Sequence, residues 1–352
     1  MSPIPVVWSP RCREHVPGAE IWLGVPTPGT EVPERVDVIL DALRGAGHEL
    51  YDAVPHDDSF LEAVHDPVFL EHLATVHESW TASGIAEESG QHQVVPYVFP
   101  TAAMLGGIPA SRAAAVHGRA GAFGYDTMTL VGPGTWRAAR GAADCALTAV
   151  DRVVGGAGAS YALCRPPGHH ATAAGYGGSC YLNNAAIAAQ ALRGAGHERV
   201  AVVDVDAHHG NGTSAIFYER PDVFYGSVHV DPGTGWFPHY VGHAGECGSG
   251  DGIGANRNLP LAPGAGDPEF FGAVASLASS VREHGASAVV VSLGVDAAVE
   301  DPESPLRVTR DGYRSAADVI AGLALPTVLV QEGGYHLPSL GGLVAGFLSA
   351  FD

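Results

Sequence analysis

The chain has 352 residues, of which 46% are hydrophobic and 16% charged, and its formal net charge is −20. This composition indicates a globular protein with a large core and excludes a disordered chain. Nucleic acid is disfavoured as a partner, because phosphate binding needs clustered basic residues and the chain has only 18, all arginine.

The cysteines and the N-terminus indicate in which cellular compartment the protein is expected. Five cysteines at scattered spacings, with no CxxC pair, support neither a disulfide framework nor a cysteine-based zinc site. The N-terminus lacks a basic segment followed by a long apolar core, and no apolar run reaches transmembrane length. We therefore expect a cytoplasmic protein without a membrane partner.

The first 150 residues mix helices with one irregular segment. Residues 32–47, 67–80 and 135–154 have the apolar periodicity of helices. Residues 94–134 are rich in Gly, Ala and Pro and lack clear periodicity. A connection of this length in a compact domain is usually a functional loop or an interface.

The second half alternates apolar strands with helices. This alternation implies a parallel sheet covered by helices on both faces. Without an internal repeat or a low-complexity linker, we expect a single α/β domain over 1–352. The predicted strands are 159–170, 199–206, 222–232, 286–298 and 326–336, and the predicted helices are 183–196 and 268–285.

Polar groups able to bind metal or move protons follow four of these strands. In open parallel sheets, ligands bind beyond the carboxyl ends of the strands. One such group is more often structural than catalytic, whereas four at neighbouring strand ends favour an active site. The groups are His169 with His170, the run from Asp204 to His209, Asp296, and Glu332 to Tyr335.

The spacing after the 199–206 strand predicts a metal site. Residues two apart in a strand point the same way, so Asp204, Asp206 and His208 can converge. With an aspartate from the next strand, they form a mixed oxygen and nitrogen set suited to zinc, iron(II) or cobalt rather than calcium. Three protein ligands leave a position open, which is the catalytic arrangement.

Four motifs carry a family resemblance: RPPGHH (165–170), DVDAHHGNGT (204–213), VSLGVDAAVEDP (291–302) and EGGY (332–335). In this order they resemble the zinc-dependent histone deacetylase and acetylpolyamine amidohydrolase superfamily, most closely its bacterial acetylpolyamine amidohydrolase branch. The resemblance is strong over 160–340. It implies the arginase–deacetylase fold, with a central, mostly parallel sheet and helices on both faces. It also implies hydrolysis of a small acetylated amine and a homodimer formed through the 94–134 loop.

The resemblance further implies roles for individual residues. His169 and His170 would activate water and protonate the leaving amine, and Tyr335 would donate a hydrogen bond to the oxyanion. One zinc ion per subunit would be bound by Asp206, His208 and Asp296.

A structural monovalent cation, such as potassium, and the substrate contacts are implied in the same way. Asp204 would orient His169 and also help to bind the cation. The cation's other ligands would be the backbone of Asp206 and His208 together with Ser227 and Val228. The implied substrate contacts are Gly178, Ser179, Phe237 and Tyr176.

Three positions depart from the family pattern. Asn211 stands where many histone deacetylases have an aspartate behind the second histidine, so His170 should be protonated less readily than His169. Ser179 stands where the family usually has an aromatic residue in the wall of the acyl tunnel. Tyr176 would restore this wall only by turning inward. No acidic residue occurs over 91–125 or 252–266, where Arg112 and Arg119 stand instead, so recognition of a polyamine's distal ammonium groups is in doubt.

Three alternatives were weighed against this hypothesis. An arginase-like site with two manganese ions needs further bridging carboxylates, but Gly210 and Ala298 occupy those positions. An inactive module that binds acylated ligands is disfavoured because Tyr335 and all three ligands are present. A protein or peptide acyl-lysine deacetylase needs an open rim, which the 94–134 loop would crowd.

Overall fold

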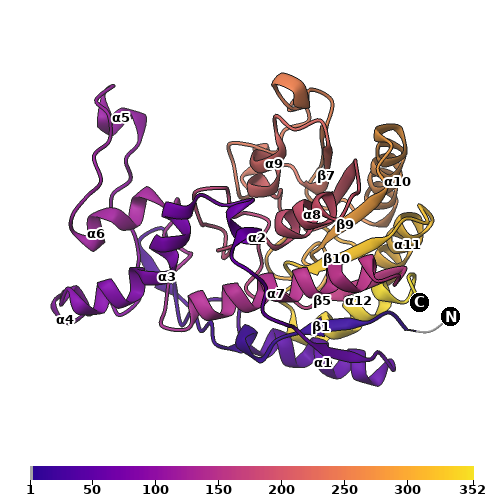
Figure 1. The fold of residues 1–352 in the computed structure, drawn as a ribbon, viewed down its shortest axis with the longest axis horizontal. Coiled ribbons are helices and arrows are strands. Elements are labelled where there is room, and N and C mark those ends of the chain that lie inside the picture. Colours follow the sequence, from indigo (N-terminus) through magenta and orange to yellow (C-terminus); the bar gives the residue numbers. More distant parts are fainter. Residues whose placement is uncertain (1–2) are drawn as a thin grey trace.

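The computed structural model describes residues 3–352, and an eight-stranded sheet forms its centre (Figure 1). Every pair of neighbouring strands in this sheet is parallel, and the strand order is β4-β1-β5-β10-β9-β6-β7-β8. A separate antiparallel pair joins β2 to β3. The strands are β1 Val6–Trp8, β2 Glu20–Trp22, β3 Val25–Thr27, β4 Leu50–Asp52, β5 Ala159–Ala162, β6 Val200–Asp204, β7 Val223–Val230, β8 Asn256–Leu261, β9 Ala288–Leu293 and β10 Thr327–Gln331.

Helices cover the sheet in two layers. One layer contains α7 and α8, which pack on β5 and β6, and the other contains α1, α10, α11 and α12 (Figure 1). The smaller helices lie in the connections. The helices are α1 Glu34–Gly45, α2 Ser59–Glu62, α3 Pro67–Ala82, α4 Ile85–Ser89, α5 Ala102–Leu105, α6 Val116–Arg119, α7 Thr135–Val154, α8 Asn184–Gly194, α9 Asn211–Phe217, α10 Asp267–His284, α11 Arg310–Ala321 and α12 Leu337–Leu348.

The elements expected in the second half are present. Asn183 caps α8 by accepting a hydrogen bond from the backbone N–H of Ala186, and Gly285 ends α10 in the left-handed region at φ 73°. The observed strands are shorter than the predicted ones: β6 ends at Asp204, within its polar motif, and β10 ends at Gln331, directly before Glu332. The expected fold class, a parallel sheet with helices on both faces, is therefore confirmed.

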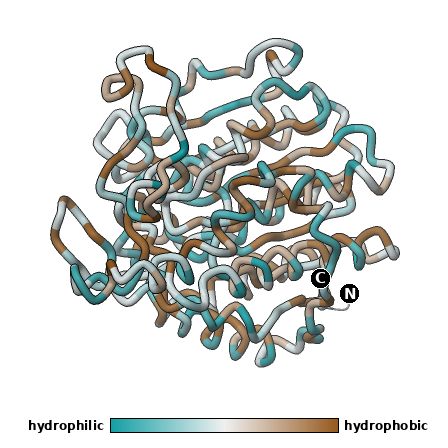
Figure 2. Tube along the Cα trace, turned by 60° about the vertical axis from the view of Figure 1, so that its left-hand side comes forward, coloured by the Kyte–Doolittle hydropathy of each residue, from teal (hydrophilic) through white to brown (hydrophobic). Residues whose placement is uncertain are grey.

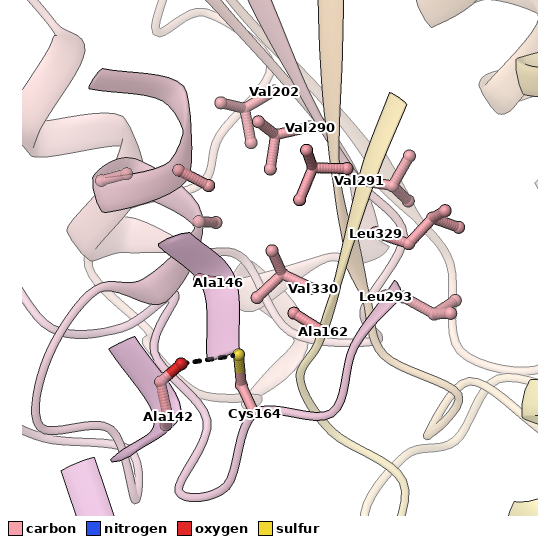
Figure 3. Packing of buried hydrophobic residues seen from close by; sticks show 14 of the residues in the cluster. Ala142, Ala146, Ala162, Cys164, Val202, Val290, Val291, Leu293, Leu329 and Val330 are labelled. Atoms are coloured by element: carbon pink, nitrogen blue, oxygen red, sulfur yellow. Dashed lines mark hydrogen bonds between the residues drawn. The ribbon is translucent and has the colours of Figure 1, made fainter. Parts of the chain in front are cut away.

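Small and β-branched side chains build the core. Val202, Val290 and Val330 are completely buried, and the alanines of α7 and α8 allow these helices to approach the sheet closely (Figure 3). The Cys164 thiol donates to the carbonyl of Ala142 in α7 at 3.2 Å. Hydrophobic segments run through the interior of the trace and hydrophilic ones gather on outer loops (Figure 2). Within residues 3–352, no helix is long and apolar enough to cross a membrane.

A buried ion-pair cluster ties the segment before α1 to the loop after β10. Glu31 Oε1 lies 2.8 Å from both Arg35 Nη1 and Arg165 Nε, and all three side chains are almost fully buried. Arg35 also donates to the carbonyl oxygens of Glu332 and Gly334. Breaking such a pair would leave a buried charge uncompensated, so the cluster fixes this loop against the rest of the protein.

Candidate active site

Three side chains meet beyond the carboxyl ends of β6 and β9. Asp206 and His208 follow β6, Asp296 follows β9, and one ligand atom of each lies within 4.8 Å of the others. His208 Nδ1 is 3.0 Å from Asp296 Oδ2 and 3.5 Å from Asp206 Oδ1. Ligands about 2.0–2.1 Å from a tetrahedral zinc ion lie about 3.3 Å from one another. The structure thus brings the three expected ligands together at a spacing that fits one transition-metal ion.

The two buried aspartates favour a cation between them. Asp206 and Asp296 are 1% and 0% exposed, and the backbone N–H groups of Gly333 and Ala207 donate to one oxygen of each. Burial, and next the charge of Asp206, raises the pKa of Asp296 to about 7. Two buried carboxylates this close repel each other unless one is protonated or a cation lies between them. The donor set therefore fits a divalent ion.

A second group of possible ligands lies nearby and consists of His169, Cys180 and Glu332. The Glu332 carboxylate is already engaged, because Oε2 accepts hydrogen bonds from the backbone N–H groups of Gly168 at 2.7 Å and His169 at 3.1 Å. Burial raises the pKa of the Cys180 thiol well above its usual range, whereas a metal requires the thiolate. This group is better explained as support for the backbone of the histidine pair.

The tandem histidines have different partners. His169 Nδ1 is 3.0 Å from Asp204 Oδ2, His170 Nδ1 is 2.7 Å from Asn211 Oδ1, and the ring centroids are 4.0 Å apart. Asp204 can therefore hold His169 in the tautomer that leaves Nε2 free, and the amide oxygen of Asn211 does the same for His170.

The pKa values of the two histidines move in opposite directions. Burial alone would lower the pKa of His169, but the charges of Asp206 and Asp204 raise it to about 10. Burial, followed by the charges of His169 and His208, lowers the pKa of His170 well below its usual range. His170 thus has the lower pKa of the two, as expected from Asn211. The largest causes for His170 are burial and the charges of His169 and His208. A divalent ion on Asp206 would neutralise that carboxylate and bring the pKa of His169 down.

Tyr125, which the sequence analysis did not single out, supports the second histidine. Its hydroxyl donates to the carbonyl of His170 at 2.8 Å and lies 3.4 Å from the side-chain nitrogen of Asn211. Its ring occupies the space beside Gly177, where an added Cβ would lie 2.2 Å from the nearest ring carbon. The end of the 94–134 segment therefore contacts the active site. An isolated tyrosine in a Gly- and Ala-rich loop was the available signal.

Tyr335 stands at the cavity floor and is held from two sides. The Arg35 guanidinium carbon lies 4.9 Å from the centre of the Tyr335 ring, and Asp301 Oδ2 accepts the backbone N–H of Tyr335 at 2.7 Å. Burial raises the pKa of Tyr335 well above its usual range, and Arg35 opposes this shift only in part. The phenol is therefore protonated at neutral pH and able to donate a hydrogen bond.

A cavity of about 320 Å³ opens above His170, His208 and Tyr335. Gly178 has φ 56°, and an added Cβ would lie 2.4 Å from the His170 ring, so this close approach requires glycine. Phe237 packs edge-on against His170 with ring centroids 4.7 Å apart. The other lining residues are Glu20, Trp22, Thr30, Met128, Ser179, Gly235, Trp236, His239 and Glu303.

Of the four expected substrate contacts, three line the cavity and one does not. Gly178, Ser179 and Phe237 are lining residues. Tyr176 is completely buried and stacks against Phe69 and Tyr181 at centroid distances of 6.4 and 5.9 Å. Its expected role at the cavity wall is therefore corrected: it packs in the core, because this aromatic cluster buries the ring more fully than the cavity would.

Two acids at the cavity mouth escaped the sequence analysis. Glu20 comes from β2 and Glu303 from the loop after β9, far in sequence from the segments searched for acids. Thr30, between them in the lining, donates to Glu303 Oε1 at 2.9 Å. Burial, and then the charge of Glu303, raises the pKa of Glu20 to about 7. Only the fold brings these carboxylates to the mouth.

The expected residues of the monovalent cation site also lie together. Parallel pairing of β6 with β7 places Asp204 beside Ser227, and Val228 follows in the same strand. The Asp204 carboxylate is completely buried and is contacted by the Tyr225 hydroxyl and the His169 ring, each at 3.0 Å.

The sheet topology and this arrangement of side chains are those of a deacetylase, and comparison with known proteins defines the class. The chain belongs to the histone deacetylase family, whose domain matches residues 29–351. It is 43% identical over 321 residues to an acetylpolyamine amidohydrolase from Burkholderia pseudomallei, covering 91% of each chain. It is 38% identical over 332 residues to the acetylpolyamine amidohydrolase from Mycoplana ramosa, covering 94% of each.

Solved structures agree with the sequence comparisons. A crystal structure of acetylpolyamine aminohydrolase from Burkholderia pseudomallei matches with a TM-score of 0.93 and 40% identity, over 99% of this chain and 98% of the other. The HD domain of HDA15 matches with a TM-score of 0.80 and 27% identity. The resemblance to the bacterial acetylpolyamine amidohydrolase branch and the arginase–deacetylase fold are therefore confirmed.

Metal binding to the Asp206, His208 and Asp296 set predicts a stability change. A divalent ion that binds only the folded state stabilises it, by about 4 kcal/mol at 1,000 times its Kd. Zinc should therefore raise the Tm of the chelator-treated protein, and Asp296→Asn should abolish the increase. Cys180→Ser is the matched control for the second ligand group and should keep it. If Cys180→Ser lost the increase in Tm and Asp296→Asn kept it, the metal would bind the second group instead, and the prediction would be wrong. Differential scanning calorimetry measures the Tm of each protein with and without zinc.

Proposed function

We propose that the protein is a zinc-dependent deacetylase that hydrolyses the amide of a small acetylated amine bearing a second, protonated nitrogen. The observation that carries the proposal is the meeting of three metal-binding side chains, two histidines and a buried phenol at the floor of one cavity. The near full-length relatives named acetylpolyamine amidohydrolase support the same reaction class.

The residues at the cavity floor divide the work of hydrolysis. Zinc, when bound by Asp206, His208 and Asp296, supplies a Lewis acid that polarises the acyl carbonyl. His169, oriented by Asp204, accepts a proton from the attacking water, and the leaving nitrogen receives one from the histidine pair. Tyr335 donates a hydrogen bond to the oxygen on which negative charge develops. Gly178 offers its carbonyl to the substrate N–H. Its own N–H is already engaged, because it donates to Asp126 at 2.6 Å.

Glu20 and Glu303 give the mouth its preference for a cation. They face the cavity together with the aromatic rings of Trp22 and Trp236, and an ammonium group is stabilised both by carboxylates and by aromatic faces. Glu20 and Glu303 therefore support recognition of a distal ammonium group, although the 91–125 loop has no acids. The acids come instead from β2 and from the loop after β9.

The same proposal includes the cation and the assembly. The register of β6 and β7 supports a potassium ion held by Asp204, Ser227, Val228 and the backbone of Asp206 and His208. We assign the whole chain to one catalytic domain, with 94–134 as an insertion that forms a homodimer. That segment projects away from the sheet at α5, and its exposed apolar side chains support an interface (Figure 1). They are Tyr97, Met104 and Ile108, which are 72%, 63% and 72% exposed.

Replacement of the phenol tests the chemistry. Loss of a hydrogen-bond donor to the oxyanion typically costs about 10²- to 10³-fold in kcat. Tyr335→Phe should therefore lower kcat by this factor while the zinc content stays unchanged. Near-full activity in the variant would remove Tyr335 from the oxyanion role. The wild type should be assayed on acetylated diamines and on acetyl-lysine peptides, and equal or higher kcat/KM on peptides would favour the protein deacetylase alternative.

Charge at the mouth predicts both a mutational and a pH effect. Glu20, with its raised pKa, is neutral below about pH 7 and anionic above it, so the KM for an acetylated diamine should fall as pH rises through 7. Glu303→Gln should raise this KM by about five-fold, the value of one ion pair worth about 1 kcal/mol. It should also move the inflection to lower pH. An acetylated alkylamine without the second nitrogen is the control, and equal effects on both substrates would contradict the assignment.

The dimer proposal is tested by the solution mass. The wild type should have twice the 36.2 kDa mass of the chain by light scattering. Ile108→Asp places a charge in the proposed apolar interface and should yield monomer, whereas Val154→Asp, exposed at the end of α7, should leave the dimer intact. A monomeric wild type, or an unaffected Ile108→Asp dimer, would refute this interface.

A further inference from the structure

Asp301 connects two parts of the cavity that are distant in sequence. It lies in the loop between β9 and α11 and is 7% exposed. Its Oδ1 accepts the backbone N–H of Glu303 at 3.1 Å, and its Oδ2 accepts those of Tyr335 at 2.7 Å and His336 at 3.0 Å. One carboxylate thus holds the backbone of a mouth acid and the backbone of the oxyanion donor.

The surroundings of Asp301 make these bonds strong. Hydrogen bonds to an ionised carboxylate are about twice as strong as those between neutral groups. Tyr335 and His336 precede α12, and a negative charge is favourable at a helix N-terminus. Burial raises the pKa of Asp301, whereas its backbone N–H donors, and then the charge of Arg35, which covers the Tyr335 ring, favour the ionised carboxylate. The loop is therefore fixed by Asp301 at its backbone and by Arg35 at the ring.

The side chain of Glu303 completes the connection. Its carboxylate is held by Thr30 at 2.9 Å on one side and faces the cavity on the other. A cation that binds at the mouth therefore acts on the segment 301–303. The Asp301 carboxylate links the backbone of this segment to the backbone of Tyr335. Small displacements of a reacting or stabilising group have large effects on rate.

We propose that Asp301 is a positioning residue that couples occupancy of the mouth at Glu303 to the alignment of the Tyr335 phenol. This inference rests on the proposed function. Its consequence is that the second ammonium of a substrate raises kcat and does not act on KM alone. In the wild type, an acetylated diamine should accordingly have a higher kcat than a neutral acetylated alkylamine of the same length.

The test is a double-mutant cycle with Tyr335. Asp301→Asn keeps the size of the side chain but removes its charge and sets an amide against N–H donors. We expect kcat for the diamine to fall about 10- to 100-fold, a fraction of the full loss of the phenol's hydrogen bond. KM should change less than kcat, and the kcat values of the diamine and its neutral analogue should converge. In Tyr335→Phe protein, adding Asp301→Asn should lower kcat by less than about two-fold, since residues acting through one contact are not additive.

The control separates this role from general loss of structure. Asp267 accepts the backbone N–H of Thr309 at 2.7 Å at the start of α10, and Asp267→Asn should leave kcat unchanged. Asp301→Ser is the second variant if Asp301→Asn does not fold, and it should show a smaller loss in the same direction. Losses that multiply in the Tyr335→Phe background, or equal losses on both substrates, would overturn the proposal.

Amide hydrogen exchange gives a readout that does not depend on turnover. In Asp301→Asn, the amides of Tyr335 and His336 should exchange about 10-fold faster or more, while α12 keeps its protection. Unchanged exchange at these two amides, or faster exchange throughout α12, would refute a positioning role whatever the activity. A wild type that hydrolyses no acetylated amine would refute the proposed function instead, and the two failures are therefore distinguishable.

Discussion

The burial of Asp206 and Asp296 side by side is the constraint on which the site depends. Two carboxylates without solvent repel each other, and the chain bears this cost at the ends of two neighbouring inner strands, β6 and β9. The repulsion is relieved by backbone N–H groups of Ala207 and Gly333, by His208, and by a cation. The loops after β6, β9 and β10 must therefore take defined positions, because each contributes a donor or a ligand.

The strand ends were the part of the site most open to prediction. In a parallel sheet all carboxyl ends lie at one edge, and the polar motifs meet because β5, β10, β9 and β6 are consecutive neighbours in the strand order. The motifs around His169, Asp204 and Tyr335 converge for this reason. Period-two spacing likewise gave Asp206 and His208 as a pair. The prediction assumed that these strands are neighbours, and the observed strand order agrees with that assumption.

Other features depended on contacts that no local pattern encodes. The three-residue strands β1 and β4 are too short for a periodic signal. The edge strand β8 contains Asn, Arg and Pro, which are not typical of a buried strand. Glu20 reaches the mouth only because β2 folds beside the loop after β9. Tyr176 was expected to turn inward and restore the aromatic wall lost at Ser179, but its ring stacks with Phe69 and Tyr181 in the core.

The cavity has opposite electrostatic requirements at its two ends. At the floor, a divalent cation held by Asp206, His208 and Asp296 would compensate the two carboxylates and offer a Lewis acid to the acyl oxygen. At the mouth, Glu20 and Glu303 have no basic residue among the other lining groups except histidines, so a cation is attracted. Hydrolysis adds one positive charge to the amine, since the freed nitrogen is protonated near neutral pH. A fully ionised mouth would hold this product more tightly than the substrate. Burial, and then the charge of Glu303, raises the pKa of Glu20 to about 7, so the negative charge at the mouth is smaller below this pH than above it.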